Sequence, residues 1–299
     1  MKPILIALIS NILIAGCKFF GYIITGSASM LSESIHSLGD CGNQLLLIIG
    51  KYRSEKQADF KFNFGHGKEE FIWSFLVAII LFSLGSIFSC VEGIKHIITP
   101  TKLENIFLVI GILFIGICLE GFSLYHALKE TNNKNIFKYI KQSSNSSNLV
   151  VLIEDFAAIT GLTFSFIFIL MAYFINPIFD GVGALTTGII LGALSIILAI
   201  ELANLIKGES LSQKETYQIK SMIIKEKLVE NVNGIFSTII AKEKYLIIVS
   251  VDPHNSDNGY DIEYISQKIK TIIKEKYPNA TIFVDFSEKS NSYSECNKT

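Results

Sequence analysis

Cysteine pairs at the spacing of a zinc finger or of a disulfide framework are missing from this 299-residue chain. The cysteines are odd in number and scattered, as Cys17, Cys41, Cys90, Cys118 and Cys296. This pattern excludes a cysteine-based zinc site and a disulfide-stapled domain. A net charge is also nearly absent, at −1, so we expect no nucleic acid among the partners.

A signal peptide with a cleavage site is missing as well. Only Lys2 precedes the first apolar run, and no small-residue cleavage site follows it, so we expect this run to remain as a spanning helix. Hydrophobic residues make up 50% of the chain and the mean hydropathy is +0.45, which is high for a soluble protein. Six apolar stretches reach the length of about 20 residues that a membrane-spanning helix needs. They cover residues 3–25, 29–50, 70–94, 105–128, 147–175 and 177–205.

The composition changes near Gly208, where ordinary amphipathic sequence begins. Asn233-Gly234 indicates a turn before the first of two β-rich runs. The predicted elements are a helix over 211–229, strands over 235–240 and 245–251, an amphipathic helix over 261–276 and a strand over 281–286. Their order αββαβ predicts a small α+β domain.

The predicted fold is therefore a membrane all-α bundle of six transmembrane helices followed by this cytoplasmic α+β domain. We expect the bundle in residues 1–208, the αββαβ domain in 209–287 and a disordered tail in 288–299. Lysine and arginine gather in the loops at 51–68 and 129–141. The positive-inside rule then places both termini in the cytoplasm, and we expect the cell (inner) membrane.

The stretch from Ser29 to Gln44 carries unusual polar residues for a membrane span. His36 and Asp40 are four residues apart and share one helix face, and Asn43 continues that face. An imidazole and a carboxylate at membrane depth are costly unless they face the bundle interior or bind something. Both are zinc ligands, so the pair predicts half of a metal site. A polar pair satisfied by neighbouring helices is the alternative.

The fifth apolar stretch offers the other half, because it contains the adjacent acids Glu154 and Asp155. Adjacent residues lie about 100° apart around a helix, so only one acid is expected to point straight at the second stretch. The other acid is expected to pair with a neighbouring helix or to keep its proton. Asn148 shares a face with Asp155 at a spacing of seven residues.

These motifs resemble the cation diffusion facilitator family of zinc exporters, and the likeness covers nearly the whole chain. The matching segments are Gly26–Leu31, His36-x-x-x-Asp40-x-x-Asn43-Gln44, Phe64–Glu69 and Asp180-Gly181. The two acids followed by Ala157-Ala158 resemble the branch of the mitochondrial zinc transporter. The resemblance implies six spanning helices, a cytoplasmic domain, a homodimer and a tetrahedral metal site between spans two and five.

The resemblance places His36 and Asp40 at the ligand positions of span two, with Asn43 in support of the ligands. It places Asp155 at the second ligand position of span five. Val151 stands where the family has histidine or aspartate. We therefore expect Glu154 or Asn148 to complete the tetrahedron.

A second metal position on the cytoplasmic side is implied by Asp59 and His66, which match ligands in some family members. Phe62 replaces the histidine between them, which leaves two of three ligands, while zinc sites use three or four. The αββαβ domain contains a single histidine, His254. We expect that domain to serve as a dimerisation surface.

The function expected from these observations is proton-coupled efflux of a divalent cation, and not an enzymatic reaction. Zn²⁺ is then the transported substrate, no organic cofactor is needed, and the partners are the lipid bilayer, divalent metal ions, protons and a second copy of the chain. Loading requires a neutral His36 and ionised carboxylates, so protons compete with the metal. The alternatives are a carrier for Mn²⁺, Fe²⁺ or Co²⁺, and a non-transporting membrane module that senses metal or scaffolds a partner.

Overall fold

The computed structural model describes the backbone of residues 2–100, 106–130, 146–254 and 259–287. Side chains are described in these ranges except for residues 2–10, 28, 29, 36, 126, 127, 130, 259 and 260. The chain forms two compact units, Met1–Gln57 with Glu69–Ala203, and Ala58–Lys68 with Asn204–Thr299. The tail predicted to be disordered, 288–299, lies outside the described residues.

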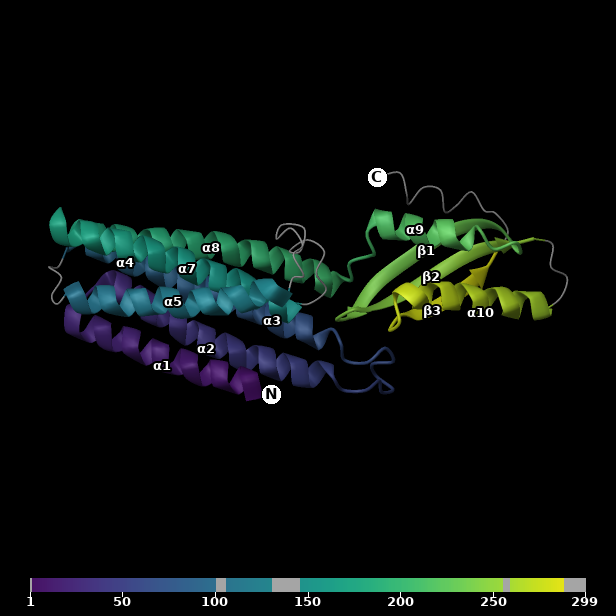
Figure 1. Ribbon diagram of the computed structural model, residues 1–299, viewed down its shortest axis with the longest axis horizontal. Coiled ribbons are helices and arrows are strands. Elements are labelled where there is room, and N and C mark those ends of the chain that lie inside the picture. Colours follow the sequence, from purple (N-terminus) through teal and green to yellow (C-terminus); the bar gives the residue numbers. More distant parts are fainter. Residues whose placement is uncertain (1, 101–105, 131–145, 255–258, 288–299) are drawn as a thin grey trace. The chain divides into compact units, whose positions relative to one another are not determined.

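The first unit is a bundle of long helices (Figure 1). In chain order the helices are α1 (Lys2–Thr25), α2 (Ala28–Ser54), α3 (Glu69–Ile80), η1 (Leu81–Ile87), α4 (Phe88–Ile98), α5 (Ile106–Glu130), α7 (Ser146–Phe174) and α8 (Ile178–Lys207). Gly26 makes the turn between α1 and α2 with a φ of 64°, which costs glycine little. Ser27 then caps α2, because its hydroxyl accepts the backbone N–H of Met30 at 3.3 Å.

Four helical segments of the described chain are long and apolar enough to cross a membrane. They are Glu69–Ile98, Ile106–Tyr125, Ser146–Phe174 and Ile178–Lys207. The part of α1 with described side chains, Asn11–Thr25, is a shorter apolar helix. α2 is helical throughout its 27 residues, but charged residues such as Glu33 and Asp40 lower its hydropathy. The apolar spanning helices are thus present, and their total of six stays a prediction.

The third span differs from the uniform helix that we expected over 70–94. Its middle, Leu81–Ile87, is π-helical, and no feature of the sequence predicts this change of winding. The following helix, α4, packs very closely on α8: a Cβ at Gly93 would lie 2.6 Å from the backbone nitrogen of Leu185, and one at Gly181 would lie 2.7 Å from the carbonyl oxygen of Gly93. Small residues on both helices allow this close packing.

The second unit contains a three-stranded sheet and two helices. They are α9 (Gln213–Ile223), β1 (Val229–Ala241), β2 (Lys244–Pro253), α10 (Gly259–Lys276) and β3 (Thr281–Phe286). β2 is central, antiparallel to β1 and parallel to β3. The parallel pair needs a crossover, which α10 supplies. The order αββαβ is as predicted, and the last strand has the predicted bounds.

Two local predictions for this unit are wrong. The first helix ends at Ile223 instead of continuing to residue 229, because β1 already begins at Val229. Asn233-Gly234 is not a turn: it lies inside β1, where the pairing with β2 shifts register between Val232 and Gly234. A glycine within a strand often marks such a bulge, and its local sequence signal is the same as that of a turn.

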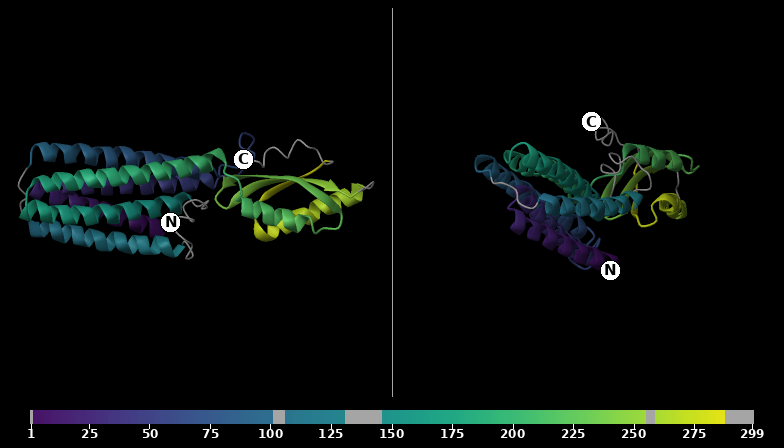
Figure 2. Two further views of the ribbon diagram at one scale, coloured as in Figure 1. Left: turned by 90° about the horizontal axis from the view of Figure 1, so that it is seen from above. Right: turned by 60° about the vertical axis from the view of Figure 1, so that its left-hand side comes forward.

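The helices α9 and α10 cover one face of the sheet (Figure 2). Ile219 of α9 and Ile269 of α10 pack with Ile247 and Val249 of β2 in a fully buried core. Successive strand residues point to opposite faces. Ile248 therefore points away from the helices, and it is 38% exposed.

Candidate functional site

Three buried polar side chains from α2 and α7 meet inside the membrane unit. Asp40 and Asn43 lie three residues apart on α2, and Asn43 Nδ2 donates to Glu154 Oε1 of α7 at 3.1 Å. The carboxyl groups of Asp40 and Glu154 also share a hydrogen bond. The three side chains are at most 6% exposed. We call this set, Asp40, Asn43 and Glu154, the Asp40 layer.

Asp155 is adjacent to Glu154 on α7, and its side chain points in a different direction, as expected for neighbouring residues of a helix. Ser123 Oγ of α5 donates to Asp155 Oδ2 at 2.7 Å, and Glu120 of α5 and Asp40 of α2 are both close enough to interact with Asp155 electrostatically. The structure thus places Glu154, rather than Asp155, directly against Asn43 of α2. Sequence reasoning missed Ser123, although a hydroxyl in the apolar fourth stretch was a visible signal.

The other candidate for the fourth ligand is Asn148. It is buried on α7 but six residues before Glu154, a rise of about 9 Å along the helix axis. Ligand atoms of one tetrahedral zinc site lie about 2.0–2.2 Å from the ion, so two ligands cannot be separated by such a rise without long side chains. Asn148 and Glu154 are therefore not expected to share one tetrahedral shell, and the role of Asn148 stays a prediction from the sequence.

His36 lies within α2, four residues before Asp40, and its side chain is outside the described part of the structure. Among the side chains that are described, no three histidine, cysteine, aspartate or glutamate groups are arranged to hold a metal ion. The described residues therefore contain part of the expected ligand set, and the role of His36 stays a prediction from the sequence.

Two buried acceptor oxygens on α2 have no hydrogen-bond partner among the described residues. They are Asn43 Oδ1 and Gln44 Oε1. A buried acceptor without a donor costs about 1–3 kcal/mol. A cation beside these oxygens would offset that cost, so their chemistry fits a site that binds a positively charged substrate.

The cytoplasmic-side pair predicted in the loop is formed in the second unit. His66 Nε2 lies 3.0 Å from Asp59 Oδ2, and the backbone N–H of Phe62 donates to Asp59 Oδ1 at 2.7 Å. The hydrogen bond with His66, followed by that from Phe62, lowers the pKa of Asp59 below its usual range. The Phe62 ring lies against the His66 imidazole, with ring centroids 4.6 Å apart. It occupies the place of the absent third ligand, so the metal position of Asp59 and His66 stays a prediction.

Two further polar groups have structural partners. Asp180 is buried in the first turn of α8 and accepts a hydrogen bond from Ser27 Oγ at 2.8 Å, so it links α8 to the start of α2. His254 is exposed, and its Nδ1 lies 3.7 Å from Glu230 Oε2. Neither group adds a ligand to the Asp40 layer.

Known proteins are similar to this chain over most of its length. The family model of the cation efflux transmembrane domain matches residues 4–207. The chain is 28% identical over 258 residues to the mouse mitochondrial proton-coupled zinc antiporter SLC30A9, covering 84% of this chain and 46% of the relative. It is 27% identical over 263 residues to metal tolerance protein C4 of Arabidopsis thaliana, covering 84% of this chain and 56% of that protein.

A third relative, magnetosome protein MamB of a Magnetospira strain, is 28% identical over 187 residues, which cover 61% of this chain and 59% of the relative. The chain spans about half the length of the mouse and Arabidopsis relatives. The family match includes every residue of the Asp40 layer and both predicted ligands of α2. The chain therefore belongs to the cation efflux, or cation diffusion facilitator, family, and within it resembles the branch of the mitochondrial zinc antiporters.

Proposed function

We propose that this protein exports divalent cations, with zinc as the preferred substrate, in exchange for protons. The observation that carries the proposal is the Asp40 layer, which joins two carboxyl groups and an amide from α2 and α7 in the interior of a membrane bundle. Ionisable residues at this depth are costly unless they bind or relay something. The names of the mouse and Arabidopsis relatives, a zinc antiporter and a metal tolerance protein, support a metal as that substrate.

The substrate ligands in this proposal are His36 and Asp40 on α2 and Glu154 and Asp155 on α7. Glu154 already faces Asp40 through their shared hydrogen bond. Asp155 is the next residue on α7 and joins the shell if the helix turns toward α2. Imidazole and carboxylate together favour Zn²⁺, whereas an all-oxygen site suits Mn²⁺ or Mg²⁺. No organic cofactor is required.

Proton exchange follows from the same ligands. Two carboxyl groups can share a hydrogen bond only when a proton lies between them, so Asp40 and Glu154 are suited to hold a proton when no metal is bound. Metal binding requires deprotonated ligands and releases protons. A bundle that opens alternately to the two sides would then exchange cytoplasmic metal for protons from the other side.

The direction of transport depends on the membrane orientation. Basic residues in the loops at 51–68 and 129–141 support a cytoplasmic position for those loops and for both termini, and we propose a cell (inner) membrane. Substrate is then loaded from the side of the 51–68 loop. It is released at the opposite end of the bundle, where α2 begins and α7 ends.

Zinc uptake by inverted membrane vesicles tests this function. We expect uptake when the vesicle interior is acidic and loss of uptake when an ionophore collapses the proton gradient. Equal zinc uptake with and without the proton gradient would contradict the proposed exchange for protons. Absence of metal uptake in every orientation would favour the alternative of a non-transporting module.

The homodimer is proposed to use the uncovered face of the sheet. Phe236 of β1, Ile248 of β2 and Phe283 of β3 are direct neighbours across the strands. They are 41%, 38% and 53% exposed. Three aligned apolar side chains on a face without helices are typical of a surface that a partner covers, and a second copy presents the same surface.

Phe283→Glu is expected to convert the purified dimer into monomers, because it places a charge in the centre of the proposed contact. Light scattering after size-exclusion chromatography in detergent measures the mass. Tyr217→Glu is the matched control: Tyr217 is 74% exposed on α9, on the covered side of the sheet, and its substitution should leave the dimer intact. A Phe283→Glu variant that stays dimeric would place the interface elsewhere.

A further inference from the structure

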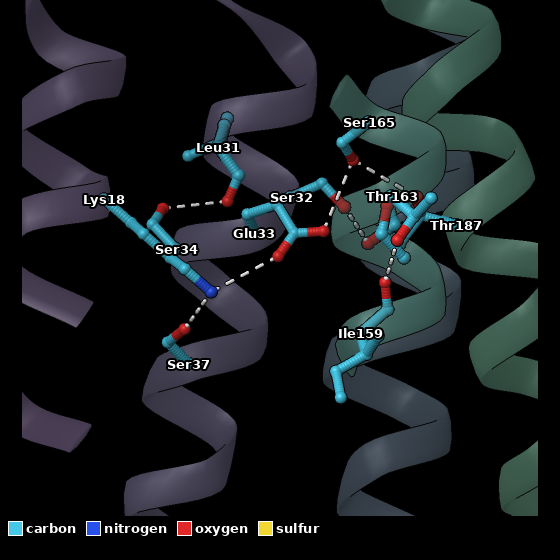
Figure 3. Close-up of polar contacts among 12 residues, drawn as sticks. Lys18, Leu31, Ser32, Glu33, Ser34, Ser37, Ile159, Thr163, Ser165 and Thr187 are labelled. Carbon is cyan, nitrogen blue, oxygen red and sulfur yellow. Dashed lines mark hydrogen bonds and ion pairs between the residues drawn. The ribbon is translucent and has the colours of Figure 1, made fainter. Parts of the chain in front are cut away.

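A second buried polar layer lies in the membrane unit, and the proposed transport chemistry does not use it. Lys18 of α1 and Glu33 of α2 form an ion pair, with Nζ and Oε2 3.3 Å apart and both side chains 1% exposed. Lys18 Nζ also donates to Ser37 Oγ at 2.9 Å. Figure 3 shows the ammonium group reaching both partners.

The other oxygen of Glu33 faces α7. Ser165 Oγ donates to Glu33 Oε1 at 3.3 Å, and Ser165 in turn lies 3.5 Å from Thr187 Oγ1 of α8 (Figure 3). Ser165 and Thr187 are also buried. We call Lys18, Glu33, Ser37, Ser165 and Thr187 the Glu33 layer.

The Glu33 layer and the Asp40 layer occupy the same contact between α2 and α7. Glu33 lies ten residues before Asn43 on α2, and Ser165 lies eleven residues after Glu154 on α7. These separations correspond to about 15 Å along α2 and about 16 Å along α7. Because the two helices run antiparallel, the Glu33 layer and the Asp40 layer lie at two different depths along the same helix pair. The Glu33 layer is the step nearer the start of α2 and the end of α7, which is the proposed release end.

Stability alone does not account for a charged pair here. Replacing a buried ion pair by apolar groups of similar volume is often neutral or stabilising, because desolvation of the charges offsets their attraction. Charges inside membrane bundles instead mark ion and proton paths. A carboxylate, three hydroxyls and an ammonium group on the proposed release path are therefore candidates for a role in passage of the substrate.

We propose that Glu33 is a second cation-binding carboxylate on the release path, and that Lys18 is a tethered cation that occupies it between transport cycles. This inference rests on the proposed transport function. A divalent cation leaving the Asp40 layer displaces the Lys18 ammonium from Glu33, with the hydroxyl oxygens of Ser37 and Ser165 beside it. The ammonium then returns and displaces the metal. Competition from Lys18 keeps binding weak, as rapid passage through a site requires.

Two variants of the full-length chain test the assignment. Lys18→Met leaves Glu33 without its competitor, so equilibrium dialysis of the purified protein with Zn²⁺ should find one more bound zinc per chain than in the wild type. Uptake into vesicles should fall by about tenfold, which corresponds to about 1.4 kcal/mol, because the metal leaves Glu33 slowly. The double variant with Lys18→Met and Glu33→Gln leaves no charge in the Glu33 layer, so no unpaired buried ion remains there.

The double variant should return the zinc count to that of the wild type, while uptake stays about tenfold low because the second carboxylate is missing. A packing role predicts the opposite: no extra zinc in Lys18→Met and wild-type uptake in the double variant, and that result would overturn the inference. The zinc count is independent of transport. A wild-type protein without uptake would thus refute the proposed function, while the extra zinc in Lys18→Met would still support Glu33 as a cation site.

Discussion

Glu154→Gln is expected to lower zinc uptake by at least about a hundredfold, since changes to groups that only orient metal ligands already cost about 10–100-fold. The glutamine keeps the size of the side chain and can still contact Asn43, which now donates to Glu154 at 3.1 Å. It removes a negative charge that faces Asp40. Initial rates of zinc uptake by inverted vesicles, normalised to the amount of protein, measure the effect.

Val151→Ala and Asn148→Ala are the matched controls on the same helix. Valine has no electron pair to donate, and Asn148 lies about 9 Å along the axis from Glu154, so both variants should retain nearly full uptake. Asp155→Asn is expected to lower uptake as well, because Asp155 is a proposed ligand, although it accepts a hydrogen bond from Ser123 in the present conformation. Full uptake by Glu154→Gln together with loss of uptake in Asp155→Asn would assign the ligand position to Asp155 alone and contradict our prediction.

Whether Glu154 or Asp155 faces α2 could not be predicted from the sequence. Adjacent helical residues differ by about 100° in direction, so the pattern predicts that one acid faces α2. Which one does so depends on the rotation of α7 about its axis, and that rotation is set by its packing against several helices. Contacts such as that of Ser123 with Asp155 are therefore visible only once α5 and α7 are assembled.

The sequence pattern predicts an element well where the residues of that element alone determine its structure. The strand at Thr281–Phe286 has the predicted bounds, because a β-rich run begins three residues after Pro278. The π-helical segment Leu81–Ile87 has no such local signal. Lys18 and Glu33 were both visible as charges in apolar stretches, but their pairing joins residues of α1 and α2 and depends on how those helices pack.

His36→Asp is expected to shift the preference of the carrier from Zn²⁺ toward Mn²⁺. The substitution keeps a ligand at the same position of α2 but exchanges an imidazole nitrogen for a carboxylate oxygen. With Asp40, Glu154 and Asp155 as the other proposed ligands, the site would then contain only oxygen donors. Such a shell suits harder cations, and we expect the ratio of zinc to manganese uptake to fall by at least about tenfold.

Uptake of each metal by inverted vesicles, measured separately and in competition, gives this ratio. His254→Asp is the control for the exchange of histidine by aspartate, because His254 is exposed in the second unit, and its ratio should equal that of the wild type. A loss of uptake for both metals in His36→Asp, with zinc binding preserved, would place His36 in gating rather than in the metal shell. An unchanged ratio at wild-type rates would exclude His36 from the ligands, and the nitrogen donor that favours zinc would have to come from another residue.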